Sequence, residues 1–362
     1  MEKANRNYSL DFLKILAAIG IVFHHFQSIT GVRYDNFINF YGSWFEWGLL
    51  VEFFFILSGY FMYRYVNVIK SGGVTLFEWW KKRAVRLIPM AAITVVFFEI
   101  VLLIHNSFFT PNLWGLKPSL WEAVTAMLCV QEGWGFPNPI INNSIWYISS
   151  LMFCYVLFYI VTALSEKLKC NPIYFYVATV FIGIGVRNYG IDLPFLNWQM
   201  SRGYYAFFFG LLLSAYLSNQ TISKKHVIGS LSVIAFCIVA FIFAHQYVIP
   251  HLNFVLTFLF YPALVILFET KPVRSVFRHK IWGTVSAISF EVYLWHLPLL
   301  LLLYLVARAA SWVPDFANMG GMLIFTVATW GVASLMYFFV ERPITNLLTK
   351  NKKQQEVAKE TA

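Results

Sequence analysis

Charged side chains are scarce in this chain of 362 residues: they make up 12% of the sequence, whereas hydrophobic residues make up 59%. Soluble domains contain about 25% charged and about 45–50% apolar residues. A water-soluble fold of this length could not hide so much apolar surface. The composition therefore excludes a soluble protein and indicates a chain that lies in lipid.

Cysteine and acidic residues are also few. The four cysteines lie far apart without paired spacing, so we expect neither a disulfide framework nor a metal site. Only 17 acidic residues stand against 27 lysines and arginines, which gives a net charge of +10. The basic residues form short clusters between apolar stretches, which is typical of membrane proteins and argues against nucleic-acid binding.

Long apolar stretches are abundant. A helix needs about 20 mostly apolar residues to cross the hydrocarbon core. We therefore predict an all-α, polytopic transmembrane helical bundle of about ten spans: 9–29, 44–66, 86–106, 144–164, 172–187, 203–218, 227–246, 252–268, 285–306 and 318–340. Segment 119–130 is too short to span. Its capping-box pattern, Ser119 and Glu122, predicts a short helix lying flat on the membrane surface, with a re-entrant segment as the alternative.

The distribution of lysine and arginine predicts the orientation. When alternate connections are assigned to opposite sides, most basic residues fall on one side, and the other side keeps only Arg33, Lys117, Arg187, Arg202 and Arg308. The positive-inside rule then makes both termini cytoplasmic. We expect a membrane domain over 1–349 and a polar, disordered cytoplasmic tail over 350–362. The long external connection, 107–143, carries Trp114, Trp121 and Trp134 as candidates for stacking on a sugar or for an interfacial lid.

Ionisable groups inside spans are costly, so they are candidates for function. Lys14 and His25 are 11 residues apart, which is about three turns of helix, so they share one face at a separation of about 16 Å. Asp11 is placed to pair with Lys14. The alternative is that Asp11 and Lys14 only anchor the interface and that His25 is a satisfied interior histidine. His24 points about 100° away, so we do not expect the two histidines to share a role.

Further spans add polar candidates. Glu52 lies at nearly the depth of His25 and would either orient it or bond to a neighbouring helix. Glu291 and His296 lie on the ninth span, and we favour a structural role for Glu291. Arg83 and Arg86 share a helix face and would either clamp a phosphorylated group, such as that of coenzyme A, or simply anchor the helix at the interface.

Six stretches carry motifs along the whole chain: 8–14 with His25; 52–60, ending in Leu-Ser-Gly-Tyr; Arg83 and Arg86 with Pro89; 146–149, which begins with Trp146; Tyr293 and His296 with Pro298; and 341–343. Their order and spacing resemble the acyltransferase-3 family of membrane O- and N-acyltransferases. Two departures stand out. Lys14 replaces the usual arginine, which removes a bidentate fork, and 150–152 lacks the acidic residues that many members carry after the middle-helix tryptophan.

The resemblance implies that acetyl-CoA or another acyl-CoA enters from the cytoplasm as a co-substrate, with no permanently bound cofactor. The acyl group would pass to a hydroxyl or amine acceptor at the outer face, such as a cell-surface glycan or a lipid-linked saccharide. His25 would be the general base or the acyl carrier, with Glu52 beside it. Lys14, Arg83 and Arg86 would hold the donor, and Asp11, Trp146, Tyr293 and His296 are further candidates.

The family also implies a bacterial plasma membrane. The alternative function is a small-molecule transporter or flippase, because charges on one stripe serve a conducting path as well as a catalyst. Use of a thioester donor discriminates between the two.

Overall fold

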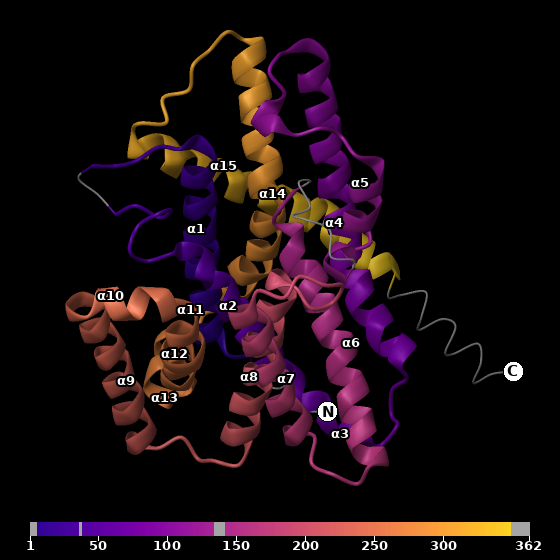
Figure 1. Cartoon of the computed structure of the whole chain (residues 1–362), viewed down its shortest axis with the longest axis vertical. Helices are drawn as coiled ribbons and strands as arrows, with labels where there is room; N and C mark the ends of the chain where they lie inside the picture. The colour runs from indigo at the N-terminus through magenta and orange to yellow at the C-terminus, as the bar shows by residue number, and fades with distance from the viewer. Residues whose placement is uncertain (1–5, 36–37, 134–141, 349–362) are drawn as a thin grey trace, which may run out of the picture.

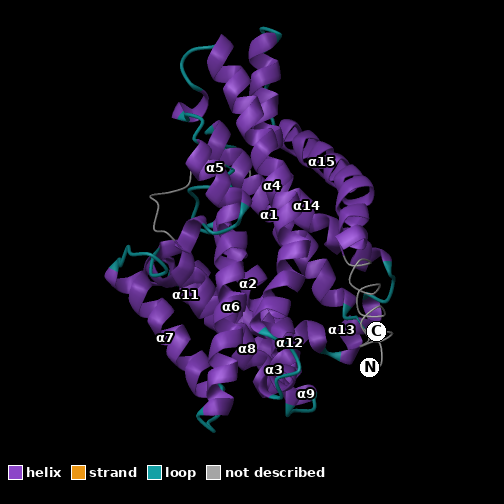
Figure 2. Cartoon of the chain, turned by 90° about the vertical axis from the view of Figure 1, so that its right-hand side faces the viewer, coloured by secondary structure: helices purple, strands orange, loops and turns teal. Residues whose placement is uncertain are grey.

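The computed structural model describes residues 6–35, 38–133 and 142–348. These residues form helices and connecting loops and include no β-strand (Figure 2). The predicted all-α class is therefore confirmed. The predicted tail over 350–362 lies outside the described residues, as does Trp134.

The helices follow one another along the chain as Figure 1 labels them. The long ones are α1 (Tyr8–Thr30), α4 (Leu76–Phe108), α6 (Ile145–Lys167), α7 (Ile173–Tyr189), α8 (Trp198–Ser218), α9 (Lys224–Phe243), α14 (Ile281–Ala309) and α15 (Met319–Met336), which continues into the π-helical turn η7 (Tyr337–Glu341). One composite run joins η1 (Trp47–Leu49), α2 (Leu50–Met62), η2 (Tyr63–Tyr65) and α3 (Val66–Lys70). A second joins α10 (His245–Val248), η5 (Ile249–His251), α11 (Leu252–Val255), η6 (Leu256–Phe260) and α12 (Tyr261–Glu269). The short connecting helices are η3 (Leu113–Gly115), α5 (Leu120–Met127), η4 (Gln131–Gly133) and α13 (Lys271–Val276).

Within the described ranges, eight helical runs are long and apolar enough to cross a membrane. They correspond to eight of the predicted spans. The other two predicted spans correspond to α7, which has 17 residues, and α8, which begins with polar turns. The multi-pass architecture is thus confirmed, while the count of ten and the cytoplasmic placement of both termini stay predictions.

The start of the third span differs from the prediction. The Thr75 hydroxyl accepts a hydrogen bond from the Glu78 backbone N–H, and the Glu78 carboxylate accepts one from the Thr75 N–H at 3.0 Å. This capping box starts α4 at Leu76 rather than at residue 86. Arg83 and Arg86 consequently lie on the first turns of a continuous helix. The predicted cap of the 119–130 segment is also present, because the Ser119 side chain accepts a hydrogen bond from the Glu122 backbone N–H and starts α5.

Glycines bring α2, α7 and α8 into backbone contact. A Cβ added at Gly59 of α2 would lie 1.9 Å from the Phe207 carbonyl oxygen, and one at Gly210 of α8 would lie 2.1 Å from the Ile56 carbonyl oxygen. A Cβ at Gly183 of α7 would lie 2.8 Å from the backbone nitrogen of Tyr205 in α8. Small residues allow this close approach of membrane helices. This packing orients α8 so that Arg202 faces Glu52 of α2.

A second group of helices surrounds α14, which packs against α1, α4 and α15 (Figures 1 and 2). The predicted pair of Asp11 and Lys14 is present at 3.2 Å, and Asp11 also accepts from Arg6 Nε at 2.6 Å and from the Ser286 hydroxyl at 3.0 Å. Because Ser286 belongs to α14, these bonds hold the first turns of α1 against α14. The two helices that carry His25 and His296 therefore run side by side.

Large apolar side chains point outward from α9 and α15. Phe236 and Phe243 of α9 are 64% and 81% exposed, and Ile324 and Val327 of α15 are each 72% exposed. In Figure 1, α9 stands at the left-hand margin of the bundle. Such surfaces are stable only against lipid, which agrees with a membrane protein.

Candidate active site

His25 and His296 form a hydrogen-bonded pair at the interface of α1 and α14. The distance from His25 Nδ1 to His296 Nε2 is 2.9 Å, and the two rings stack with their centroids 4.9 Å apart. The two residues are 271 positions apart in the chain. His296 is almost fully buried, so this contact anchors the less enclosed His25 to the helix core.

The partners of His296 determine which nitrogen of His25 carries the proton. His296 Nδ1 lies 3.3 Å from the Val292 carbonyl oxygen, and a carbonyl only accepts, so Nδ1 of the neutral ring must be protonated. His296 Nε2 then offers a lone pair and accepts from His25 Nδ1–H. His25 Nε2 is left with its own lone pair and can act as a base.

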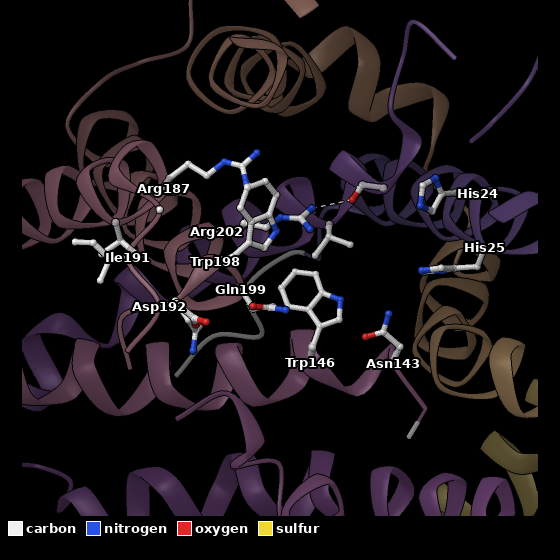
Figure 3. A pocket seen from close by; sticks show the side chains of 15 residues that line it. His24, His25, Asn143, Trp146, Arg187, Ile191, Asp192, Trp198, Gln199 and Arg202 are labelled. Atoms are coloured by element: carbon white, nitrogen blue, oxygen red, sulfur yellow. Dashed lines mark hydrogen bonds between the residues drawn. The ribbon is translucent and has the colours of Figure 1, made fainter. Parts of the chain in front are cut away.

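His25 borders a cavity of about 620 Å³ at the end of the bundle that the charge bias predicts to be external. Figure 3 shows its ring turned toward this cavity, with Trp146 and Asn143 opposite. The wall also includes Trp198 and the polar residues His24, Arg187, Asp192, Asn197, Gln199 and Arg202. Aromatic rings together with amide and charged groups suit a polar acceptor that has apolar ring faces.

Glu52 does not contact His25. Its carboxylate receives two hydrogen bonds from Arg202, from Nε and Nη2 at 2.7 Å each, and a third from the Tyr205 hydroxyl at 3.0 Å. The arrangement matches the second of the two roles considered for Glu52, a bond to a neighbouring helix. Arg202 also donates to the Gly48 carbonyl oxygen at 2.9 Å and lies over the Trp146 ring at 4.8 Å. The pair therefore positions Trp146 and Arg202 in the cavity wall.

His24 shares the cavity with His25 but has different partners. Its Nδ1 lies 2.9 Å from the Phe40 carbonyl oxygen and 3.0 Å from a Glu46 carboxylate oxygen. Both partners accept, so Nδ1 carries the proton. Gln27 binds the same connection, because its amide oxygen accepts from the backbone N–H of Phe40. His24 thus fastens the loop that covers this end of α1.

The predicted donor-binding residues lie toward the other end of α1. Lys14 pairs with Asp11, and its Nζ lies 4.8 Å from the centre of the Phe61 ring. Arg83 stacks on the Trp79 ring at 3.2 Å and donates to the Trp79 carbonyl oxygen at 3.1 Å. Arg86 is exposed, and its charge acts on Lys14. The structure therefore places Lys14 within electrostatic range of Arg86 and holds Arg83 against aromatic rings.

Tyr293 supports the cavity from behind. Its hydroxyl donates to the Ser144 carbonyl oxygen at 2.6 Å, and the Asn142 side chain donates to the Leu294 carbonyl oxygen at 3.3 Å. These bonds fix the start of α6 against α14, next to Trp146. Glu291 accepts from the Trp295 indole N–H at 3.0 Å, which agrees with the structural role favoured for it.

The tryptophans of the long connection occupy other places. Trp114 packs against Phe98 and Tyr304, and Trp121 is 57% exposed on α5. Neither borders the cavity, whose aromatic wall comes from Trp146 and Trp198 instead.

Glu132 is buried in the η4 turn, outside the helical runs that are long enough to span. Its backbone N–H donates to the Ser149 hydroxyl at 3.1 Å, and its carbonyl oxygen accepts from Asn197 at 2.7 Å. Burial raises the pKa of the Glu132 carboxyl to about 8. A largely protonated Glu132 therefore stands directly behind the cavity wall, since Asn197 borders the cavity.

The sequence did not identify two arginines of the cavity, Arg187 and Arg202, as site residues. It placed them only among the basic residues of the external side, and the scarcity of basic residues on that side was the signal that could have marked them as functional. Arg187 stacks on the Trp198 ring at 2.9 Å. Both arginines reach the cavity because α7 and α8 pack closely at Gly183.

Comparison with known proteins gives a consistent family match. A family model described as an acyltransferase domain, that of the acyltransferase-3 family, matches residues 7–339. The chain is 24% identical to the peptidoglycan O-acetyltransferase OatA of Listeria monocytogenes over 93% of this chain and 55% of that protein. It is 24% identical to the O-acetyltransferase OatA of Staphylococcus aureus over 92% of this chain and 56% of that protein.

A third relative is the putative peptidoglycan O-acetyltransferase YrhL of Bacillus subtilis, 25% identical over 92% of this chain and 54% of that protein. The chain thus spans about half the length of the curated relatives it matches. No solved structure matches it.

Proposed function

Because the chain belongs to the acyltransferase-3 family, we propose that it moves an acetyl or other acyl group from acyl-CoA to a hydroxyl or amine acceptor on the far side of a bacterial plasma membrane. The observation that carries the proposal is His25. One nitrogen of its ring is bound to His296, and the ring borders a cavity of about 620 Å³ large enough for a sugar-sized acceptor.

The chemistry follows from the tautomer. The acceptor hydroxyl gives its proton to His25 Nε2, and its oxygen forms a bond to the thioester carbonyl carbon. The carbon–sulfur bond then breaks, and the proton passes from His25 to the leaving thiolate. In this scheme His25 is a general base that is neutral and available near pH 7. Direct acylation of Nε2 is the other route, and it would leave a trappable acyl-histidine.

The donor enters from the opposite end of α1. Lys14 and Arg86 lie close enough for their charges to interact, and Arg83 is one turn away from Arg86 on α4. Three cations at a helix interface suit the phosphates of coenzyme A. Lys14 and His25 are about 16 Å apart along α1, so an extended thioester arm bridges the distance between them.

The acceptor is proposed to be a cell-wall glycan. The relatives from Listeria monocytogenes and Bacillus subtilis carry peptidoglycan in their names. Trp146 and Trp198 in the cavity wall offer ring faces for a sugar, and Asn143 and Gln199 offer hydrogen bonds to its hydroxyls. These features support a saccharide acceptor and carry no preference for one glycan.

The experiment measures thermal stability and acyl transfer with the purified protein in detergent. Acetyl-CoA at a hundredfold excess over its dissociation constant should stabilise the folded protein by roughly 2.7 kcal/mol. Release of free thiol from acetyl-CoA should then depend on added peptidoglycan fragments. The His25→Ala variant should remain folded and still be stabilised by acetyl-CoA, but it should lose transfer.

Two outcomes oppose the proposal. Wild-type transfer by His25→Ala would remove His25 from the mechanism. The absence of any stabilisation by acetyl-CoA or coenzyme A at millimolar concentration would favour the transporter, because a transporter needs no thioester.

A further inference from the structure

A second cavity, of about 580 Å³, lies at the opposite end of α1 from the site of acyl transfer. It is bordered by the residues that lead into α1 and by α13, and Tyr8 in its wall is 17 positions before His25, or about 26 Å along the helix. Four cationic side chains line it: Arg6, Lys271, Arg274 and Arg278. None of them takes part in the proposed transfer.

Among the residues that the structure describes, acidic side chains neutralise only part of the positive charge of this cavity. Arg6 pairs with Asp11 at 2.6 Å, and Arg274 lies 3.6 Å from Glu269. Asp11 is also shared with Lys14. In the described part of the chain Lys271 and Arg278 have no ion-pair partner.

Lys271 and Arg278 are both exposed beside the cavity. Like charges gathered in one hollow repel one another, so an anion that enters it is stabilised.

The surroundings of the cavity indicate what kind of anion fits. Val276 and Ile281, on either side of the turn between α13 and α14, are 74% and 52% exposed. Phe277 in the same turn stacks on Phe12 at 4.6 Å and contacts Trp282, so the turn is held firmly against α1. A basic hollow beside an exposed apolar surface fits a ligand that has both a phosphate and hydrocarbon chains.

The position of the cavity in the bundle agrees with a ligand that has both a phosphate and hydrocarbon chains. The cavity lies where α12 ends and where α1 and α14 begin, which is the boundary of the membrane-spanning helices. The charge bias predicts that this end faces the cytoplasm, where basic pockets between transmembrane helices meet anionic headgroups.

We infer that the pocket formed by Arg6, Lys271, Arg274 and Arg278 binds the phosphate headgroup of an anionic phospholipid, with its acyl chains along Val276 and Ile281. The ligand chemistry is a phosphate group, which soluble coenzyme A also carries. The exposed apolar side chains favour the lipid, because a soluble phosphate has no hydrocarbon chains to cover them. This site is separate from the acyl-transfer site and does not depend on the proposed reaction.

The test compares dioleoylphosphatidylglycerol with dioleoylphosphatidylcholine, added to the detergent-purified full chain. Binding is counted by native mass spectrometry, and the unfolding temperature is recorded in parallel. Phosphatidylglycerol should bind and raise the unfolding temperature, and phosphatidylcholine should not. The double variant Lys271→Gln/Arg278→Gln should weaken phosphatidylglycerol binding on the order of tenfold or more, since each basic residue near an anionic surface contributes appreciably.

The matched control is Lys224→Gln/Lys225→Gln, two exposed lysines at the start of α9 on the same predicted side. It should bind phosphatidylglycerol as the wild type does. Because Lys271 and Arg278 are exposed, the test variant should fold normally in the absence of lipid. An equal loss in both double variants, or equal binding of both lipids by the wild type, overturns the inference. Stabilisation by coenzyme A that is lost only in Lys271→Gln/Arg278→Gln overturns the lipid assignment and gives the pocket to the donor.

Discussion

Replacement of His296 tests whether this residue positions His25, the proposed general base. In the wild type His296 Nε2 accepts a hydrogen bond from His25 Nδ1–H at 2.9 Å, and this leaves the lone pair of His25 on Nε2, toward the cavity. His296→Phe keeps an aromatic ring of similar size in the buried site but cannot accept the bond. His25 then loses the partner that selects its tautomer.

The size of the effect follows from the cost of leaving a buried donor without a partner, about 1–3 kcal/mol. If that free energy is what held His25 in the reactive tautomer, losing it slows the chemical step by about 5-fold to 150-fold. His296→Gln should be slowed less, because the amide oxygen can accept the same hydrogen bond. Neither variant should change donor affinity, since His296 lies far from Lys14.

The assay is steady-state transfer of acetyl groups to peptidoglycan fragments, with kcat and KM for acetyl-CoA determined separately. We expect kcat to fall in the order wild type, His296→Gln, His296→Phe, with KM nearly constant and unfolding temperatures similar. A kcat for His296→Phe equal to that of the wild type would refute the positioning role. If His296→Gln and His296→Phe were both as inactive as His25→Ala, the tautomer argument would fail as well, because the retained acceptor would then have no effect.

Three further predictions concern stability and donor binding. Glu52→Gln should lower the free energy of unfolding by about 3 kcal/mol, because it leaves Arg202, whose side chain is only 13% exposed, without its carboxylate; a thermal or denaturant melt that shows less than 1 kcal/mol would contradict this. The pKa of Glu132 is raised from its ordinary 4.5 to about 8, so the folded state keeps a proton that the unfolded state has lost. The contribution of Glu132 to the free energy of unfolding is fully present below pH 4.5 and falls by up to about 1.4 kcal/mol per pH unit as the pH rises to about 8. Glu132→Gln should therefore flatten this part of the pH profile of stability. Replacing Arg83 and Arg86 by glutamine should weaken acetyl-CoA binding in calorimetry more than Lys82→Gln does, and equal losses would indicate simple membrane anchoring.

Composition and local pattern were sufficient to predict the class of the protein. Apolar runs of about 20 residues require a lipid environment wherever they pack, so the multi-pass helical fold follows from the sequence alone. The spacing of Asp11 and Lys14 likewise determines their pairing, because both lie on one helix and the periodicity of that helix is known. The start of α4 was missed because charged residues were not counted in a span, although Thr75 and Glu78 form a cap that the sequence displays.

The arrangement of the candidate site depended on the tertiary structure. Helical periodicity tells which residues share a face, but it does not tell which face of another helix meets it. Glu52 and His25 have similar depths, yet the close contact of α2 with α8 at Gly59 and Gly210 turns the carboxylate toward Arg202.

His296 reaches His25 only because α14 packs along α1, held there in part by the bond between Ser286 and Asp11. The sequence thus determined the membrane fold and the stripe that bears His25. The packing of helices distant in the chain decided its partner, its tautomer and the cavity it faces, because these depend on the rotation of each helix about its own axis.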